Sequence, residues 1–172
     1  MAAEVLDLDG LALRIAAGQR LIGADLGAKT IGVALSDVER RIATPLETIR
    51  RTKFAKDAAR LVALMEKFDA AALVVGLPLN MDGSEGPSTQ AARAFVRNFG
   101  PLSARPCVFW DERLSTMAIT RSLIALDVSR SKRARAVDGL AAAFILQGAL
   151  DRLRWLGPAA YANQLLRIRR GS

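Results

Sequence analysis

The strongest constraint on the fold is a change of hydrophobic period part-way along the chain. Residues 20–25 and 31–36 are two apolar segments, separated by a short connection that contains Gly27. This arrangement favours an antiparallel hairpin, and residues 41–49 can add a third strand. From Phe54 to Phe68 the apolar residues recur at helical spacing instead. The chain therefore has to combine an antiparallel meander with helices.

Strand and helix signals alternate along the rest of the chain. Residues 70–76 and 106–111 are short apolar runs, which are typical of strands buried on both faces. Residues 89–98, 115–126 and 136–153 are expected to form helices. We therefore predict an α/β fold with a mixed five-stranded sheet. In this sheet a three-stranded antiparallel meander is joined by two parallel strands, and helices flank both.

The length and the distribution of apolar residues indicate one domain. The chain has 172 residues, and we expect an N-terminal extension over residues 1–20, a domain over residues 21–153 and a tail over residues 154–172. Charged residues interrupt the apolar N-terminal segment, so we do not expect it to be a signal peptide. No apolar run approaches the ~20 residues that span a bilayer. The single cysteine, Cys107, cannot form an internal disulfide. These features predict a cytoplasmic protein with no membrane partner.

The chain contains no histidine. This excludes serine–histidine–aspartate and cysteine–histidine catalysis, histidine general bases and the usual zinc sites. Any chemistry must therefore use carboxylates, lysines, hydroxyls or metal ions, and carboxylate oxygens suit Mg²⁺ or Mn²⁺ best. The formal charge of +8 favours a polyanionic partner.

Three acidic residues stand at the ends of three predicted elements. Asp25 ends a strand, Glu112 follows a buried strand, and Asp138 lies near the start of an alanine-rich helix. Each of these acids alone also has a purely structural explanation. Asp25 could cap a turn, Glu112 could lie in a solvated loop, and Asp138 could be an acid that stabilises the first turn of a helix. Together they could bind the one or two divalent ions that phosphodiester hydrolysis requires. Asp111 and Glu112 point to opposite faces along a strand, so at most one of them can share a site with Asp25.

Several basic residues flank the same ends of these elements, namely Lys29, Lys132, Arg133 and Arg135. Positive charge around an acidic, metal-binding centre suits the phosphate backbone of a nucleic acid. Arg113 could grip a phosphate or neutralise the neighbouring acids. Aromatic residues make up 5% of the chain, which favours recognition of shape and backbone over reading of bases.

Several longer motifs extend the argument, because in them the chain resembles the YqgF/RuvX family. The motifs are Asp25-Leu-Gly-Ala-Lys-Thr-Ile-Gly-Val-Ala34, Ala43-Thr-Pro-Leu46, Val74-Val-Gly-Leu-Pro-Leu-Asn-Met-Asp-Gly83, Asp111-Glu-Arg-Leu-Ser-Thr116 and Asp138 with the alanines after it. The resemblance runs from about residue 21 to residue 153.

The resemblance implies a ribonuclease-H-like fold and a metal-dependent nuclease. By motif, Asp25, Glu112 and Asp138 take the catalytic and metal-binding positions, and we expect support from Gly27, Asn80 and Asp111. The family has been described in two ways, as nucleases that mature the 5′ end of pre-16S ribosomal RNA and as Holliday junction resolvases similar to RuvC. RuvC-type enzymes carry more acids on the last helix, whereas Asp138 stands alone here. The number of bound metal ions therefore stays open.

Two other function classes compete with a nuclease. The basic residues could serve a non-catalytic RNA-binding factor in ribosome assembly or transcription. The Asp-x-Gly turn followed by Lys29 and Thr30 is similar to the phosphate loop of ATP-binding proteins of the actin and sugar-kinase superfamily. Those proteins close two such domains around the nucleotide, whereas 172 residues are enough for one domain only. Structured RNA is the favoured partner and branched DNA the alternative. The sequence leaves monomer and homodimer open.

Overall fold

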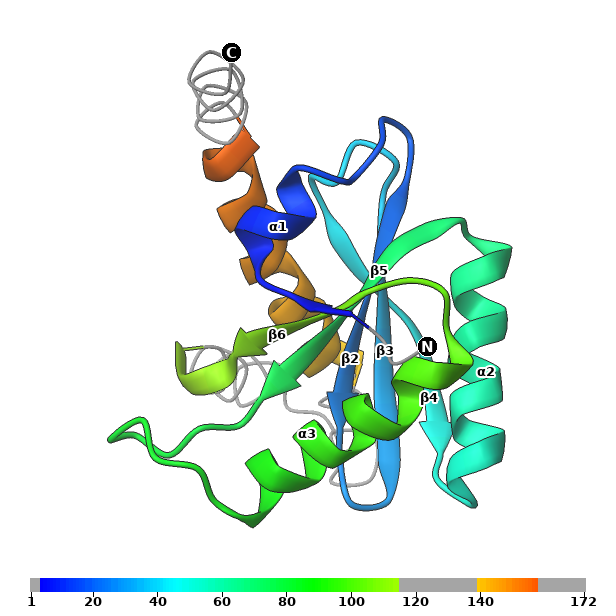
Figure 1. Cartoon of the computed structure of the whole chain (residues 1–172), viewed down its shortest axis with the longest axis vertical. Coiled ribbons are helices and arrows are strands. Elements are labelled where there is room, and N and C mark those ends of the chain that lie inside the picture. Colours follow the sequence, from blue (N-terminus) through cyan, green and yellow to red (C-terminus); the bar gives the residue numbers. More distant parts are fainter. Residues whose placement is uncertain (1–3, 115–138, 158–172) are drawn as a thin grey trace, which may run out of the picture.

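The computed structural model describes residues 4–114 and 139–157, and its centre is a six-stranded sheet in the order β1-β6-β5-β2-β3-β4 (Figure 1). The strands are β1 (Val5–Leu6), β2 (Arg20–Leu26), β3 (Thr30–Ser36), β4 (Ala43–Arg50), β5 (Ala70–Leu77) and β6 (Cys107–Asp111). The helices are α1 (Leu8–Ala12), α2 (Phe54–Lys67) and α3 (Pro87–Phe99), with the short 3-10 helices η1 (Gly100–Leu102) and η2 (Glu112–Leu114). Residues 139–157 are also helical, and we call this segment the 139–157 helix. Within the described ranges, no helix is both long and apolar enough to cross a bilayer.

The sheet is mixed, as predicted. β2, β3 and β4 form the antiparallel meander, while β2 also pairs in parallel with β5, and β5 with β6. The N–H of Gly27 donates to the carbonyl of Thr30 at 2.9 Å and closes the turn between β2 and β3. The α/β class and the ribonuclease-H-like arrangement of the sheet are thus confirmed. Because β2, β5 and β6 are parallel, their carboxyl ends reach the same edge of the sheet, which we call the carboxyl edge.

The sheet has six strands, however, and not the predicted five. The additional strand is β1, in which Val5 pairs with Cys107 and Leu6 with Val108, parallel to β6. α1 follows directly, and its Leu11 is buried in the core. A strand of two residues is too short to show an alternation of apolar and polar positions. The sequence therefore gave no sign that this segment joins the sheet.

Two apolar layers cover the two faces of the sheet. On one face Leu73 and Val75 of β5 pack with α2 and α3, which contribute residues such as Phe95. On the other face Val74 packs with the 139–157 helix, including Leu146. Figure 1 shows α2 and α3 on one side of the sheet and the 139–157 helix, in yellow to orange, on the other. This division follows from the strand geometry, since successive side chains of β5 point to opposite faces.

The single thiol belongs to this core. Cys107 is buried in β6, and burial raises the pKa of its thiol to about 12. A thiol that stays protonated at neutral pH is a poor nucleophile and a poor metal ligand. Cys107 therefore behaves as a small apolar residue.

The 139–157 helix packs closely against the sheet at Gly23. An ideal Cβ on Gly23 would lie 2.7 Å from Cβ of Leu146 and 3.0 Å from the carbonyl oxygen of Ala142. Any side chain at this position would therefore push the helix away from β2. Asp25 follows two residues later in the same strand, so it points to the same face of the sheet.

We expect Gly23→Ala to destabilise the protein by roughly 1–3 kcal/mol, because an extra methyl group in a packed core forces the backbone to shift. Urea denaturation followed by circular dichroism measures this change. The matched control is Gly157→Ala at the exposed end of the 139–157 helix, where an added Cβ meets nothing within 4 Å. The control should be neutral or slightly stabilising, since alanine favours the helix. Equal stability of the two variants would contradict the close packing of Gly23.

Candidate active site

Two of the three predicted carboxylates meet at the carboxyl edge of the sheet. Asp25 lies near the end of β2, and Glu112 directly follows β6. β5 lies between these two strands, and its Gly76 pairs with Trp110 of β6. The parallel pairing therefore brings together residues that are separated by 87 positions in the chain.

Gly76 provides the space into which the side chain of Glu112 folds. An ideal Cβ on Gly76 would collide with Oε1 of Glu112 and would lie 2.8 Å from its Cδ and 2.5 Å from Cδ1 of Ile145. Glu112 thus lies across β5, on the face of the sheet that the 139–157 helix covers. Asp25 points to this same face. A glycine at position 76 is therefore a geometric requirement of the site.

The Glu112 carboxyl is held in a place that disfavours its charge. Burial is the largest cause, repulsion by Asp25 the second and repulsion by Asp111 the third, and together they raise its pKa from 4.5 to about 7. A raised pKa that arises from burial and a neighbouring carboxylate is characteristic of functional sites. A bound cation would remove the penalty, because it compensates both negative charges.

Asp111 lies outside this pair, as the alternation along the strand predicts, and binds Arg113 instead. The Arg113 guanidinium donates from Nε to Oδ2 at 2.8 Å and from Nη2 to the same oxygen at 2.5 Å. The backbone N–H of Arg113 also donates to Oδ1 of Asp111 at 3.0 Å. The guanidinium accordingly lowers the pKa of Asp111. These bonds fix the chain on both sides of Glu112, so the Asp111–Arg113 pair can hold Glu112 in its orientation.

The loop between β5 and α3 borders the same site. Asn80 donates from its side-chain amide to the hydroxyl of Ser84 at 2.9 Å, and its backbone N–H donates to the Ser84 carbonyl at 2.9 Å. An ideal Cβ on Gly83 would lie 3.5 Å from Nη1 of Arg113. The closed turn is therefore placed beside the Asp111–Arg113 pair.

The turn between β2 and β3 carries Lys29, which is exposed. The carbonyl of Gly27 accepts a hydrogen bond from Nη1 of Arg51 at 2.7 Å, and the carbonyl of Lys29 accepts one from the backbone N–H of Arg51 at 2.9 Å. An ideal Cβ on Gly27 would lie 2.9 Å from the Thr30 carbonyl oxygen, so this turn requires a glycine. These hydrogen bonds connect the β2–β3 turn to Arg51, which directly follows β4.

The structure adds cations that the sequence analysis missed. Arg50 pairs with Thr30, and Asp25 pairs with Gly32, which itself pairs with Thr48. Residues paired across strands share a face, and so do residues two apart, so Arg50 lies on the same face as Asp25.

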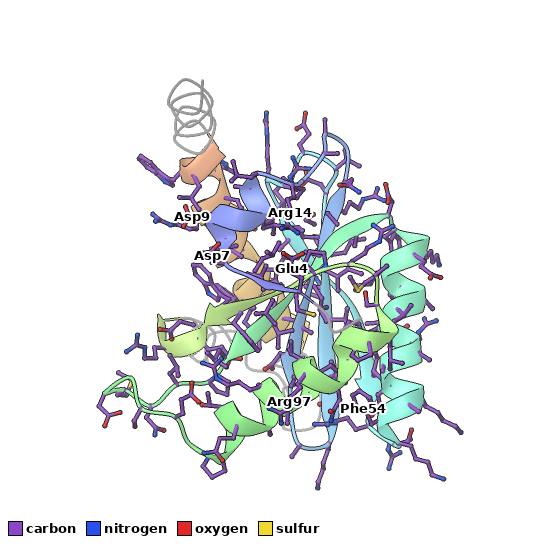
Figure 2. The ribbon with its side chains drawn as sticks, viewed as in Figure 1. Glu4, Asp7, Asp9, Arg14, Phe54 and Arg97 are labelled. Atoms are coloured by element: carbon purple, nitrogen blue, oxygen red, sulfur yellow. The ribbon has the colours of Figure 1, made fainter. Side chains whose placement is uncertain are left out.

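We call Lys29, Arg50, Arg51 and Lys53 the basic edge. Figure 2 shows Phe54, which follows Lys53, at the same end of the molecule as the β2–β3 turn. The sequence gives no direct signal for Arg50, because its position depends on the pairing of β4 with β3, which the Gly27 turn does not set.

Four predicted site residues lie outside the described residues, namely Asp138, Lys132, Arg133 and Arg135. Within residues 4–114 and 139–157, no group of three or more acids, cysteines or histidines could hold a metal ion. The described part of the site is therefore the pair Asp25 and Glu112. Carboxylate oxygens are hard ligands, so this donor set fits Mg²⁺ or Mn²⁺ and fits softer metals poorly.

Comparison with known proteins gives a consistent set of relatives. The family model described as RuvX, Holliday junction resolvase, matches residues 19–152. A protein of Methylocella silvestris, named provisionally as a pre-16S rRNA nuclease, is 69% identical over 154 residues, which are 90% of this chain and 96% of the relative. A protein of Beijerinckia indica with the same name is 67% identical over 160 residues, which are 93% of this chain and 97% of the relative. Among solved structures, Thermus thermophilus RuvC in complex with a Holliday junction substrate aligns with a TM-score of 0.49 and 18% identity, over 78% of this chain and 96% of that one.

The raised pKa of Glu112 predicts how stability depends on pH in metal-free buffer. The unfolded chain loses this proton near pH 4.5 and the folded protein near pH 7, so the free energy of unfolding should fall as pH rises through this window. Glu112→Gln removes the ionisation. We expect the Tm of this variant to fall less across the window and to exceed that of the wild type at pH 8, as differential scanning fluorimetry can measure.

Magnesium should raise the Tm of the wild type more than that of Glu112→Gln, because the ion binds the folded carboxylates. The control is Glu66→Gln, which changes an exposed glutamate of α2 and should follow the wild type. Parallel pH profiles for Glu112→Gln and the wild type would contradict the burial of Glu112 beside Asp25.

Proposed function

Since the chain belongs to the RuvX family, we propose that it is a metal-dependent nuclease that hydrolyses phosphodiester bonds in the 5′-end maturation of pre-16S ribosomal RNA. The observation that carries this proposal is the placement of Asp25 and Glu112 on one face at the carboxyl edge, where Asp25 disfavours the charge of Glu112. Such a pair is costly for the fold alone, and it is useful once a divalent cation binds. Maturation of ribosomal RNA would place the protein in the cytoplasm.

Asp25, Glu112 and Asp138 would hold the metal ion through their carboxylate oxygens, with Asp138 carried over from the family motif. A bound Mg²⁺ or Mn²⁺ would supply stabilisation of the negative charge that develops on the phosphate. The chain's own part is to keep the carboxylates in place, and three contacts serve it. Gly76 leaves room for Glu112, the Asp111–Arg113 pair fixes the backbone on both sides of Glu112, and the Gly27 turn ends the strand of Asp25.

The basic edge supports a phosphate backbone as the partner. Lys29, Arg50 and Lys53 are exposed, and Arg50 shares the face of Asp25. The exposed cations attract a polyanion, and the acids that they border then lie next to one of its phosphates. Arg113 contributes less to this attraction, because its guanidinium is already bound by Asp111.

The names of the relatives support RNA as the substrate. The Methylocella silvestris and Beijerinckia indica proteins are named for pre-16S rRNA, and their high identity over nearly the full chain favours RNA. Cleavage of a four-way DNA junction is the second candidate, because the matching family model is described as a Holliday junction resolvase. A resolvase needs two active sites, so this alternative also requires a dimer. An RNA spanning the 5′ end of 16S rRNA precursor and a four-way DNA junction, assayed side by side with magnesium, distinguish the two.

The most direct test of the proposal is Asp25→Asn, which keeps the size of the side chain and removes its charge. We expect cleavage of the precursor RNA to fall by orders of magnitude, because the divalent ion loses a ligand. RNA affinity should stay equal or rise, since one charge that repels the phosphates is gone. The measurement combines the cleavage rate, RNA affinity and Tm of the same variant.

The matched control is Asp9→Asn, an exposed aspartate of α1 at the end of the sheet opposite to the β2–β3 turn (Figure 2). This control should cleave like the wild type. If Asp25 were no more than a turn cap, Asp25→Asn would cost about 1 kcal/mol of stability or less and leave the cleavage rate unchanged. Normal cleavage by folded Asp25→Asn protein would end the nuclease proposal and favour a non-catalytic RNA-binding factor.

The basic edge predicts the salt dependence of RNA binding. The double variant Arg50→Ala and Lys53→Ala should bind a single-stranded RNA oligonucleotide more weakly. The slope of log affinity against log salt should fall by roughly 0.7 for each lost phosphate contact. The control double variant, Lys67→Ala and Arg152→Ala, removes two exposed cations elsewhere and should keep the wild-type slope. Fluorescence anisotropy at several salt concentrations measures the slope, and equal slopes for both doubles would remove the basic edge from the RNA interface.

A further inference from the structure

The loop between β5 and α3 exposes a large apolar side chain beside the candidate active site. Met81 is 81% exposed, although its neighbours along the chain are polar or small. Figure 1 shows this loop, drawn in green, projecting outward from the end of β5. β5 ends at the carboxyl edge, where Asp25 and Glu112 lie. An apolar side chain in this position invites a functional explanation, provided that the loop holds it in place.

Hydrogen bonds within the turn hold Met81 at its tip. The N–H of Gly83 donates to the carbonyl of Asn80 at 2.8 Å, and the N–H of Asn80 donates to the carbonyl of Ser84 at 2.9 Å. The carboxylate of Asp82 accepts from the N–H of Ser84 at 2.9 Å and from its hydroxyl at 2.6 Å. Gly83 adopts a φ of 84°, which glycine accommodates without strain. The polar groups of the turn are therefore satisfied locally, and Met81 is presented outward.

The turn is also braced against the active site. Gly83 faces the guanidinium of Arg113. The pKa of Asp82 is lowered mainly by its hydrogen bonds from Ser84, and the charge of Arg113 adds to this. Arg113 directly follows Glu112 and is fixed by Asp111. A nucleic acid strand whose phosphate lies at Asp25 and Glu112 would therefore pass close to the Met81 turn.

The two acids of the loop, Asp82 and Glu85, are not isolated negative charges that would repel such a strand. Asp82 lies in the field of Arg113, and Glu85 forms a salt bridge with Arg93 at 2.5 Å. The loop thus presents an apolar side chain next to the ionised Asp82, and residues 78–86 contain no cation that could bind a further phosphate. Bases present apolar faces once they are unstacked, and methionine is among the residues that insert between base steps.

We propose that Met81 is an apolar wedge that packs against an unstacked base of the nucleic acid next to the scissile phosphate, an inference that rests on the proposed nuclease function. The thioether is polarisable and offers no N–H or O–H donor, so it contacts the face of a base without reading its edge. The wedge therefore selects the point at which a duplex opens, and it leaves the base sequence unspecified. Trp110 does not take this role, because its ring packs against Gly148 of the 139–157 helix.

The experiment uses full-length protein with Glu112→Gln, so that the probe is not cleaved, with and without Met81→Ala. One probe is an RNA hairpin with 2-aminopurine at the boundary between duplex and single strand, and the other is a four-way DNA junction with 2-aminopurine at the branch. Unstacking raises the fluorescence of 2-aminopurine. We expect saturating Glu112→Gln protein to raise it on one of the probes. Addition of Met81→Ala should abolish this rise and weaken binding by roughly two- to tenfold, as expected for loss of a sulfur–ring contact.

Two further variants keep the result interpretable. Met81→Leu preserves an apolar side chain of similar size and should restore the fluorescence rise, whereas Leu102→Ala removes an exposed apolar side chain elsewhere and should leave it unchanged. The responding probe shows whether the wedge serves RNA or branched DNA. Binding with the same fluorescence rise in Met81→Ala would overturn the wedge alone and assign the exposed side chain to a protein surface or to none. Failure of the Glu112→Gln protein to bind either probe would overturn the proposed function together with the wedge.

Discussion

The contact between the Glu112 carboxylate and the backbone of Gly76 is the constraint around which the rest of the site is arranged. It places a carboxyl group across β5 at the carboxyl edge of the sheet, on a face that a helix also covers, and against the repulsion of Asp25. A protein tolerates this only if the charge is neutralised, by a proton or by a cation. The arrangement therefore has a cost in the metal-free protein, which the proposed metal ion would remove. If the proposed function holds, stability and chemistry depend on the same two carboxylates.

The neighbouring contacts help to keep Glu112 in place against Gly76. Gly23 lets the 139–157 helix come close to the face on which the carboxylates lie. The Asp111–Arg113 pair fixes the chain on both sides of Glu112 and extends the fixed region to the Asn80 turn. Along β6, Trp110 and Asp111 point to opposite faces. Trp110 can therefore pack against the core while the next residue, Asp111, binds Arg113. Positions that look unrelated in the sequence thus act on one group.

Much of this was predictable because strand and helix periods, and the register of a tight turn, are local properties. They were sufficient for the meander and the parallel strands. They left open whether Asp111 or Glu112 lies beside Asp25, and the choice of Glu112 came from the family motif. The two-residue β1 escaped because its pairing with β6 is a long-range property that two residues cannot signal. Arg50 escaped because its relevance depends on the register across three strands. The binding of Arg113 by Asp111 stayed undecided, since a sequence does not show whether a cation faces an adjacent acid or a ligand.

The two outer strands of the sheet have a consequence for self-association. β1 has two residues, and β4 contains Pro45, next to the register shift between Val33 and Ala34. Short edge strands, prolines and bulges all hinder the addition of another strand, because they interrupt the row of donors and acceptors that a new strand would need. A continuous sheet shared by two copies of the chain is therefore disfavoured at both margins. If the protein works as a pair, its subunits should therefore meet through helices or loops and not through a shared sheet.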